Sequence, residues 1–388
     1  MRKLWPFTFN ILFFGALGCV TPFIVLYYQG LGFTGAQIGI LTGVVPLITL
    51  VSAPLWTGLA DATHRYRLVM SLNLLGVAVT MFVYPLLDTF VTVFAAAAFL
   101  FVFVAPITPL ADSASMFMLA DEKEMYGRIR LGGTLGFGMA AFISGLLIQR
   151  YGLRAAFWGC AILFLLGLIV SQKLAYGHVE SQDPGGGRLR VFLTNPRWVL
   201  FLVVAFAGGL GVAAYNNYLF PYMKELGANE STMGLTITVG MFSEIPILFF
   251  GDRLIKALRS YGLLMLSMAV TGLRMLLFAA FGTPVLVLVA QILNGLTFPA
   301  MWVAGVSYAN ENAPPGMSAT AQGLFNAMVM GVGMAVGGFV GGLLLEGMGG
   351  RGLYFFFGGA VLLITAIVAL IHRRFSPGYG KLPNVAVD

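Results

Sequence analysis

Charged side chains are scarce in this 388-residue sequence, where Lys, Arg, Asp and Glu together make up only 10% of the residues. A soluble globular domain carries about 25% charged residues, whereas hydrophobic residues reach 59% here, so a water-soluble globule is excluded. The alternation of apolar and polar residues that outer-membrane strands need is also missing, because residues 90–104 and 360–371 are long apolar runs. The sequence therefore predicts an all-α protein that crosses the membrane many times.

Residues that catalyse reactions or ligate metals are few as well. The two cysteines, Cys19 and Cys160, lie in apolar stretches without metal-ligand spacing and are expected to be packing residues. The three histidines, His64, His178 and His372, lie outside the expected membrane spans, and there is no Gly-rich phosphate-binding loop. We therefore expect no enzyme, no ATP-driven pump, no cofactor, no metal and no nucleic-acid partner.

Twelve apolar segments are long enough to cross the hydrocarbon core, which needs about 20 residues. They lie at roughly 8–29, 37–58, 67–87, 90–119, 126–148, 154–174, 197–222, 231–250, 261–281, 285–309, 318–345 and 352–371. With the N-terminus in the cytoplasm, 17 of the 22 Lys and Arg residues fall on or beside the cytoplasmic side, four fall on the other side and one lies within a span. The positive-inside rule then predicts a multi-pass protein of the cell (inner) membrane with both termini in the cytoplasm.

The sequence contains a faint internal repeat. Residues 142–149 (FISGLLIQ) resemble residues 339–346 (FVGGLLLE) at an offset of 197, close to half the chain length. We expect two six-helix bundles, residues 1–176 and 196–388, joined by a polar cytoplasmic linker at 177–195. Repeats of this kind place a substrate site near the middle of the membrane, between the halves.

The loop expected after the second span reads Gly58-Leu-Ala-Asp61-Ala-Thr-His-Arg65-Tyr-Arg67, and a weaker copy, Gly251-Asp252-Arg253, follows the eighth span. At these residues the chain resembles the major facilitator superfamily, which usually has Gly where His64 stands. The resemblance implies that a cytoplasmic gate is held by Gly58, Asp61, Arg65, Arg67, Asp252 and Arg253. The alternative is that these charges are solvated anchors at the membrane surface.

Four charged residues fall inside expected spans: Asp112, Arg130, Glu244 and Arg274. Each costs about 2.5 to 3.5 kcal/mol at a helix centre on insertion scales, so each is a candidate functional residue. Each must pair with an opposite charge or face a hydrated cavity. One acid and one base lie in each half of the chain.

The segment Tyr126-Gly-Arg128-Ile-Arg130, with Asp112 before it and Phe137 after it, resembles the lactose permease and phenylpropionate permease branch of the superfamily. The resemblance implies that Asp112 and Arg130 hold substrate hydroxyls or a carboxylate and that Phe137 stacks on the substrate. It further implies that Glu244 is a ligand for substrate or proton and that Arg274 tunes its protonation.

The chain also departs from lactose permease. Spans seven and ten carry no charge here, whereas lactose permease has charged residues in both, and Phe137 replaces a tryptophan of the sugar permeases. We therefore do not expect galactoside recognition.

Neutral polar residues inside the spans complete the candidate substrate site. Asn216 and Asn217 are adjacent, and neighbours on a helix point about 100° apart, so at least one should face something polar. Asn294 and Trp302 are further candidates. The alternative for each amide is a hydrogen bond between helices, worth about 0.6 kcal/mol on average.

These observations favour a secondary active transporter that moves a small polar or aromatic solute by alternating access. We expect coupling to protons through Glu244 or Asp112, and a monomer in the lipid bilayer. A transport-inactive membrane receptor or scaffold with the same fold is the alternative.

Overall fold

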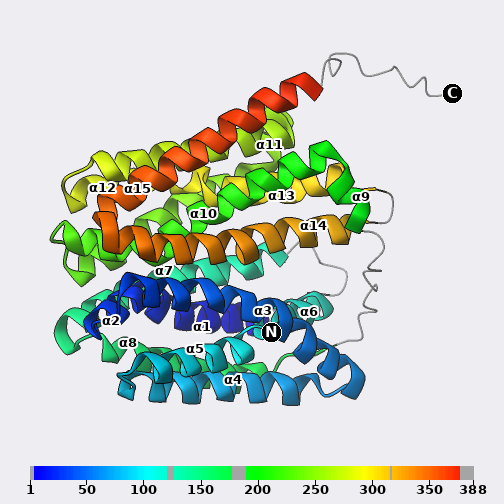
Figure 1. The fold of residues 1–388 in the computed structure, drawn as a ribbon. Coiled ribbons are helices and arrows are strands. Elements are labelled where there is room, and N and C mark those ends of the chain that lie inside the picture. The colour runs from blue at the N-terminus through cyan, green and yellow to red at the C-terminus, as the bar shows by residue number, and fades with distance from the viewer. Residues whose placement is uncertain (1–3, 120–125, 177–188, 315–316, 376–388) are drawn as a thin grey trace.

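The structure is a computed structural model that describes residues 4–119, 126–176, 189–314 and 317–375. These ranges are helical throughout apart from short turns and contain no strand (Figure 1). The first half contains α1 (Leu4–Val20), η1 (Thr21–Phe23), α2 (Ile24–Gly30), α3 (Gly35–Thr63), α4 (Tyr66–Val83), η2 (Tyr84–Leu86), α5 (Phe90–Val104), α6 (Ile107–Leu119), α7 (Tyr126–Tyr151) and α8 (Arg154–Ser171).

The second half begins with a short helix, α9 (Leu189–Thr194), and contains longer and more interrupted helices. They are α10 (Pro196–Glu225), α11 (Glu230–Ala280), α12 (Pro284–Ala290), η5 (Gln291–Leu296), α13 (Phe298–Glu311), α14 (Ser318–Asn326), the π-helical segment η6 (Ala327–Gly333) and α15 (Met334–Phe375). The expected all-α membrane fold is thus confirmed.

Eleven helical stretches of the described residues are long and apolar enough to cross a membrane. The last, Thr320–His372, has 53 residues, or about 80 Å of helix at 1.5 Å per residue. The hydrocarbon core is only about 30 Å thick, and the stretch bends at Gly349, whose φ is 68°. It therefore provides two crossings, which brings the total to the expected twelve.

The expected end of the second span is wrong. The second span was expected to end at residue 58, but α3 continues to Thr63, so Gly58 and Asp61 lie on the helix rather than in a loop. The helix ends at His64, which adopts a left-handed conformation with φ 55° and ψ 20°. Glycine adopts this conformation most easily. His64 therefore has the backbone conformation expected of a glycine at this turn.

The internal repeat is visible in the backbone. Six described residues have a positive φ, and they form three pairs between the halves: Gly32 with Gly227, His64 with Arg259, and Gly152 with Gly349. The offsets are 195, 195 and 197 residues. The hydroxyl of Tyr27 bonds to the carbonyl oxygens of Tyr84 and Leu87, and that of Tyr222 bonds to those of Phe278 and Phe281, 194 residues further on. The two halves therefore repeat the same turns and helix contacts.

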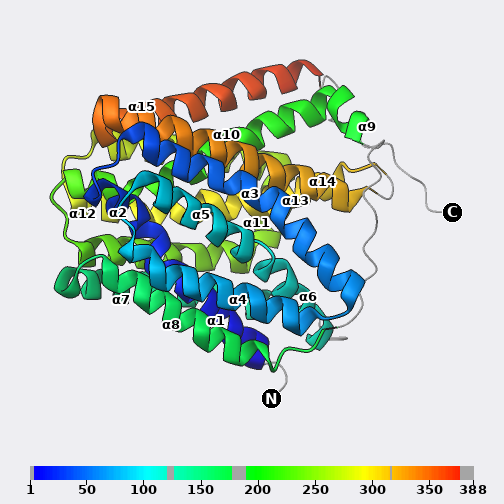
Figure 2. The same cartoon turned by 60° about the horizontal axis from the view of Figure 1, so that its bottom comes forward.

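The helices of the first half lie together, below those of the second half in Figure 1. The halves meet mainly where α3 runs beside α15 and where α7 runs beside α11 (Figure 2). Glycines allow the backbones to touch there: a Cβ on Gly39 would lie 2.7 Å from the Phe339 carbonyl oxygen, and one on Gly234 would lie 2.7 Å from that of Ala141. Small residues permit this approach in membrane helices.

These contacts lie near one end of the molecule, at the beginnings of α3 and α11 and toward the end of α7. The short helix α9 and the C-terminal end of α15 lie at the opposite end (Figure 1). We call the tightly packed end the closed end. From the closed end toward the opposite end, a central cavity lies between the two halves.

Candidate functional site

A cavity of about 830 Å³ lies between the two halves, walled by residues of α1, α7, α10, α11, η5, α13 and other elements. Seven of the nine expected substrate-binding residues line it: Arg130, Phe137, Asn216, Glu244, Arg274, Asn294 and Trp302. Asp112 and Asn217 are not among its described lining residues. The fold thus brings together side chains that lie up to 172 positions apart in the sequence.

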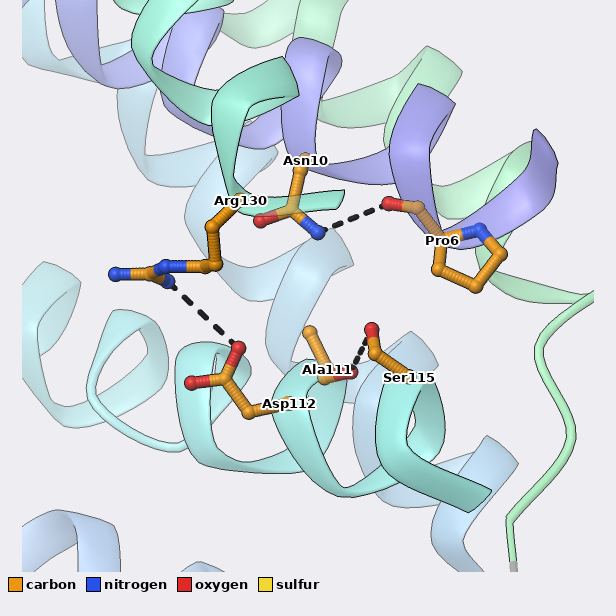
Figure 3. A network of polar contacts seen from close by, with 6 residues as sticks. All are labelled: Pro6, Asn10, Ala111, Asp112, Ser115 and Arg130. Carbon is orange, nitrogen blue, oxygen red and sulfur yellow. Dashed lines mark hydrogen bonds and ion pairs between the residues drawn. The ribbon is translucent and has the colours of Figure 1, made fainter. Parts of the chain in front are cut away.

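In the first half, Arg130 of α7 faces Asp112 of α6, and their Nη1 and Oδ1 atoms are 3.6 Å apart (Figure 3). The guanidinium of Arg130 also lies over the ring of Phe14, 5.0 Å from its centroid. Asn10 of α1, in the same region, donates a hydrogen bond to the Pro6 carbonyl oxygen at 2.9 Å. Asp112 is therefore the ion-pair partner of Arg130, and only Arg130 is among the described lining residues of the cavity.

In the second half, Arg274 of α11 is almost completely buried, with 4% of its surface exposed. Its Nη1 atom donates to Asn294 Oδ1 at 2.7 Å and to Thr297 Oγ1 at 3.0 Å. Its Nη2 atom donates to Gln291 Oε1. All three acceptors are neutral, so hydrogen bonds hold this arginine without an adjacent carboxylate among the described residues.

Aromatic rings complete the surroundings of this arginine. Its guanidinium lies 4.8 Å from the centroid of Tyr215 and 5.2 Å from that of Phe278. Such cation–π contacts help to hold a buried positive charge. Tyr215 and Phe278 also line the cavity, so the same rings present apolar surface to a bound solute.

Glu244 connects to Arg274 through an intermediary. Asn294 Nδ2 donates to Glu244 Oε1 at 2.8 Å, while Asn294 Oδ1 accepts from Arg274. This order fixes the amide orientation, because a guanidinium only donates. In this half the acid and the base are bridged by an amide and do not form a direct ion pair.

The tenth span is broken at the site. It passes from α12 into the 3₁₀ segment η5, then through Thr297, with φ −95° and ψ −103°, into α13. Ser243 of α11 supports the break, since its hydroxyl accepts from the Gly295 N–H at 3.0 Å and lies 3.1 Å from the Gln291 carbonyl oxygen. Irregular backbone inside a membrane is tolerated where protein groups satisfy it or a cavity lies beside it.

The two adjacent asparagines separate as the helix period predicts. Asn216 lines the cavity, whereas Asn217 is buried and its Nδ2 atom has no hydrogen-bond partner among the described residues. Trp302 also lines the cavity and packs on Phe298 and Phe325, with ring centroids 5.6 and 5.4 Å away. The cavity therefore combines charged groups with a largely aromatic wall.

The expected gate residues lie at the end of the molecule away from the closed end. Asp61 accepts a hydrogen bond from the Tyr66 hydroxyl at 2.7 Å, and Arg67 Nε donates to the Leu174 carbonyl oxygen at 3.4 Å. Arg253 lies 5.2 Å from the centroid of the Phe250 ring. Each of these contacts stays within one half of the chain.

For the other three expected gate residues, Gly58, Arg65 and Asp252, the structure gives no contact that supports a gate. A Cβ added to Gly58 would have no neighbour within 4 Å, Arg65 is exposed just before α4, and the side chain of Asp252 lies outside the described residues. The gate role of this set therefore stays a prediction.

Gln291, Thr297 and Ser243 surround the charged groups but were not anticipated from the sequence. Gln291 and Thr297 are the two acceptors of Arg274 besides Asn294. A glutamine or threonine in an apolar span costs less than a charge and is a weaker signal. The Gln291-Ile-Leu-Asn294 spacing was available as a clue, since residues three apart share a helix face.

Comparisons with known proteins agree with this architecture. Residues 6–356 match the model of the "MFS_1 like family". The chain is 27% identical to the maltose permease of Geobacillus stearothermophilus, covering 96% of this chain and 95% of the permease. It is 24% identical to the probable 3-phenylpropionic acid transporter of Escherichia coli (strain K12), covering 92% and 93% of the two chains.

Among solved structures, the nucleoside transporter NupG superposes with a TM-score of 0.84, covering 96% of this chain and 99% of that one. At 19% identity this likeness supports the fold alone. The family match, which extends over most of the chain, supports the function: this protein belongs to the MFS_1-like family and is a membrane transporter of a solute, not an enzyme.

Proposed function

We propose that this chain is a proton-coupled secondary transporter for a small organic solute with an aromatic or planar part and polar groups. The observation that carries the proposal is the central cavity, which Arg130, Glu244 and Arg274 line together with aromatic rings. Charges are retained at this depth in a membrane protein where they meet a substrate or an ion.

Transport would proceed by rocking of the two bundles, residues 1–176 and 196–388, about the cavity. The glycine contacts at the closed end support this motion, because close helix packing without interlocking side chains separates with little rearrangement. Toward the other end, Arg130 and Phe249 line the cavity with exposed fractions of 41% and 81%. We place the termini and the gate residues at this open end on the cytoplasmic side and take the working unit to be a monomer.

Glu244 is our candidate for the coupling proton. It lines the cavity, and Asn294 is its hydrogen-bond partner rather than an arginine. An amide can donate to a carboxylate or, after rotation, accept from a carboxylic acid. Asp112 is the weaker candidate, because Arg130 faces it directly and stabilises its ionised form.

The test is uptake into proteoliposomes, with and without a pH gradient, of solutes suggested by the relatives: maltose, a nucleoside such as uridine, and 3-phenylpropionate. We expect uptake of one class, stimulated by an inward proton gradient in the wild type and no longer stimulated in Glu244→Gln. Glu230→Gln, which changes an acid on the same helix outside the cavity, is the matched control and should keep its response.

The competing assignment is a receptor or scaffold that kept the fold without transport. It predicts binding of a solute without uptake under any gradient. Uptake that responds to the gradient equally in the wild type and in Glu244→Gln would remove Glu244 from coupling while leaving transport intact.

A further inference from the structure

We propose that the transported solute is an organic anion and that Arg274, at the break in the tenth span, holds its carboxylate. This inference rests on the proposed function and adds the chemical class of the substrate. It also assigns the anionic group to the second half of the chain rather than to Arg130.

The two cavity arginines differ in what already balances their charge. Arg130 has Asp112 at 3.6 Å, so its charge is offset by an adjacent acid. Arg274 is held by Asn294, Gln291 and Thr297, which carry no charge. Buried charges in proteins are normally paired, and no carboxylate of the described residues bonds to Arg274 directly, so we assign the anionic group of the solute to this arginine.

The hydrogen-bonding capacity of Arg274 is incomplete, as is that of Arg130, whose Nη1 atom has no hydrogen-bond partner among the described residues. The Nε atom of Arg274 is buried and has no acceptor among the described residues. An unsatisfied buried donor costs about 1 to 3 kcal/mol, and more for a charged group. Of the three side chains that bond to it, Asn294 and Thr297 also line the cavity, so the arginine is fixed in place at the cavity wall.

The start of α13 lies on the same wall, where Thr297, Phe298 and Pro299 line the cavity. The hydroxyl of Thr297 donates to the Asn294 carbonyl oxygen and accepts from Arg274, and no side chain caps the helix. The N-terminus of a helix favours negative charge through its free N–H groups and its dipole. The uncapped start of α13 and the buried Arg274, to which no described carboxylate bonds directly, thus lie beside each other, and both favour a bound anion.

Glu244, an acid that lines the cavity, does not bond to Arg274 directly. Glu244 accepts its hydrogen bond from Asn294 Nδ2, on the far side of the amide from Arg274. Tyr215 and Phe278, which pack against Arg274, and Trp302 all line the cavity, and their rings suit the apolar body of such an anion. An aryl-alkanoate, with a ring and a short chain ending in a carboxylate, fits both parts of the cavity.

The experiment is a thermal-shift titration of purified full-length protein with 3-phenylpropionate and its uncharged amide, 3-phenylpropanamide, and with the benzoate and benzamide pair. We expect the acids to stabilise the wild type and to bind about tenfold or more tightly than their amides. In Arg274→Gln this preference should disappear, and Arg274→Lys should keep part of it. Arg130→Gln should weaken both members of a pair while preserving the preference.

Several outcomes overturn the proposal. They are equal binding of acid and amide by the wild type, failure of every acid to stabilise it at millimolar concentration, and a preference that survives in Arg274→Gln. If that variant does not fold, the acid–amide comparison in the wild type decides. Gradient-driven uptake of maltose or uridine without any binding of the acids would reject the anion and leave the proposed transport function standing, whereas absence of all uptake would reject that function itself.

Discussion

Individual side chains in the cavity divide the work between two kinds of polar residue. Charged residues are the proposed ligands for solute and proton, and the amides of Asn294 and Gln291 bond to them. Asn294 is central because it contacts Arg274 with its oxygen and Glu244 with its nitrogen. An amide in this position couples the two charges without neutralising either.

Asn294→Asp should convert this arrangement into a direct ion pair between residue 294 and Arg274. The new carboxylate is nearly isosteric with the amide, so we expect the fold to be kept. It also places a second negative charge beside Glu244 and pairs with Arg274, which is then less able to bind an anionic solute. We therefore expect uptake to fall by tenfold or more. Uptake in proteoliposomes alongside the melting temperature measures both effects.

Asn312→Asp is the control, since Asn312 lies near the end of α13 and donates only to the Tyr308 carbonyl oxygen at 2.9 Å. Wild-type uptake in Asn294→Asp would show that the amide is not needed for the site.

Among the helices, the interrupted tenth span supplies the three side chains that bond to Arg274. In and after its 3₁₀ segment, Gln291, Asn294 and Thr297 are spaced three residues apart and all bond to Arg274. In a straight α-helix, with 3.6 residues per turn, these three side chains would point in more divergent directions. Ser243 on the neighbouring helix stabilises the interruption, because its hydroxyl accepts a hydrogen bond from the Gly295 N–H. The π-helical segment Ala327–Gly333 in the next span lies against α10 and α3, and π-bulges often occur at functional sites.

Ser243→Ala should leave the Gly295 N–H without its partner. We expect a loss of about 1 to 3 kcal/mol in the free energy of unfolding, together with weaker solute binding as Asn294 shifts. Ser267→Ala is matched to it, because Ser267 lies buried on the same helix but bonds only to the Leu264 carbonyl oxygen one turn away. Denaturation monitored by circular dichroism compares the two, and equal, small effects would contradict a supporting role for Ser243.

The whole molecule is organised around the contrast between its two ends. At the closed end the backbones of α3 and α15 touch through glycines on both helices. A Cβ on Gly39 would meet the Phe339 carbonyl oxygen at 2.7 Å, and one on Gly338 would meet that of Thr42 at 2.6 Å. In the proposed alternating-access cycle, these contacts separate and re-form.

Gly39→Ala should therefore disfavour the closed contact by about 1 to 3 kcal/mol, the usual cost of overpacking. We expect slower uptake and greater accessibility of the closed end to thiol reagents at a cysteine introduced at Thr42. Gly159→Ala, where an added Cβ has no neighbour within 4 Å, is the control and should leave both properties unchanged. Unchanged accessibility in Gly39→Ala would show that this contact does not limit opening.

The amino-acid sequence alone determined the class of fold, because apolar runs about as long as the bilayer is thick have few alternatives to spanning helices. It also identified Arg130, Glu244 and Arg274 as candidates, since a charge in such a run is too costly to be incidental. The end of the second span was placed five residues too early, because Gly58 does not stop α3 and the left-handed residue is His64.

Only the tertiary structure decided which groups meet. Arg274 and Glu244 are 30 positions apart in the sequence, and their separation by Asn294 depends on the break at Gln291–Leu296 and on the packing of that segment against α11. Asp112 likewise became the partner of Arg130 rather than part of the cavity wall. Apolar patterning fixes which segments enter the membrane, but the rotation and interruption of each helix are set by contacts between segments distant in the chain, and these rotations decide what faces the cavity.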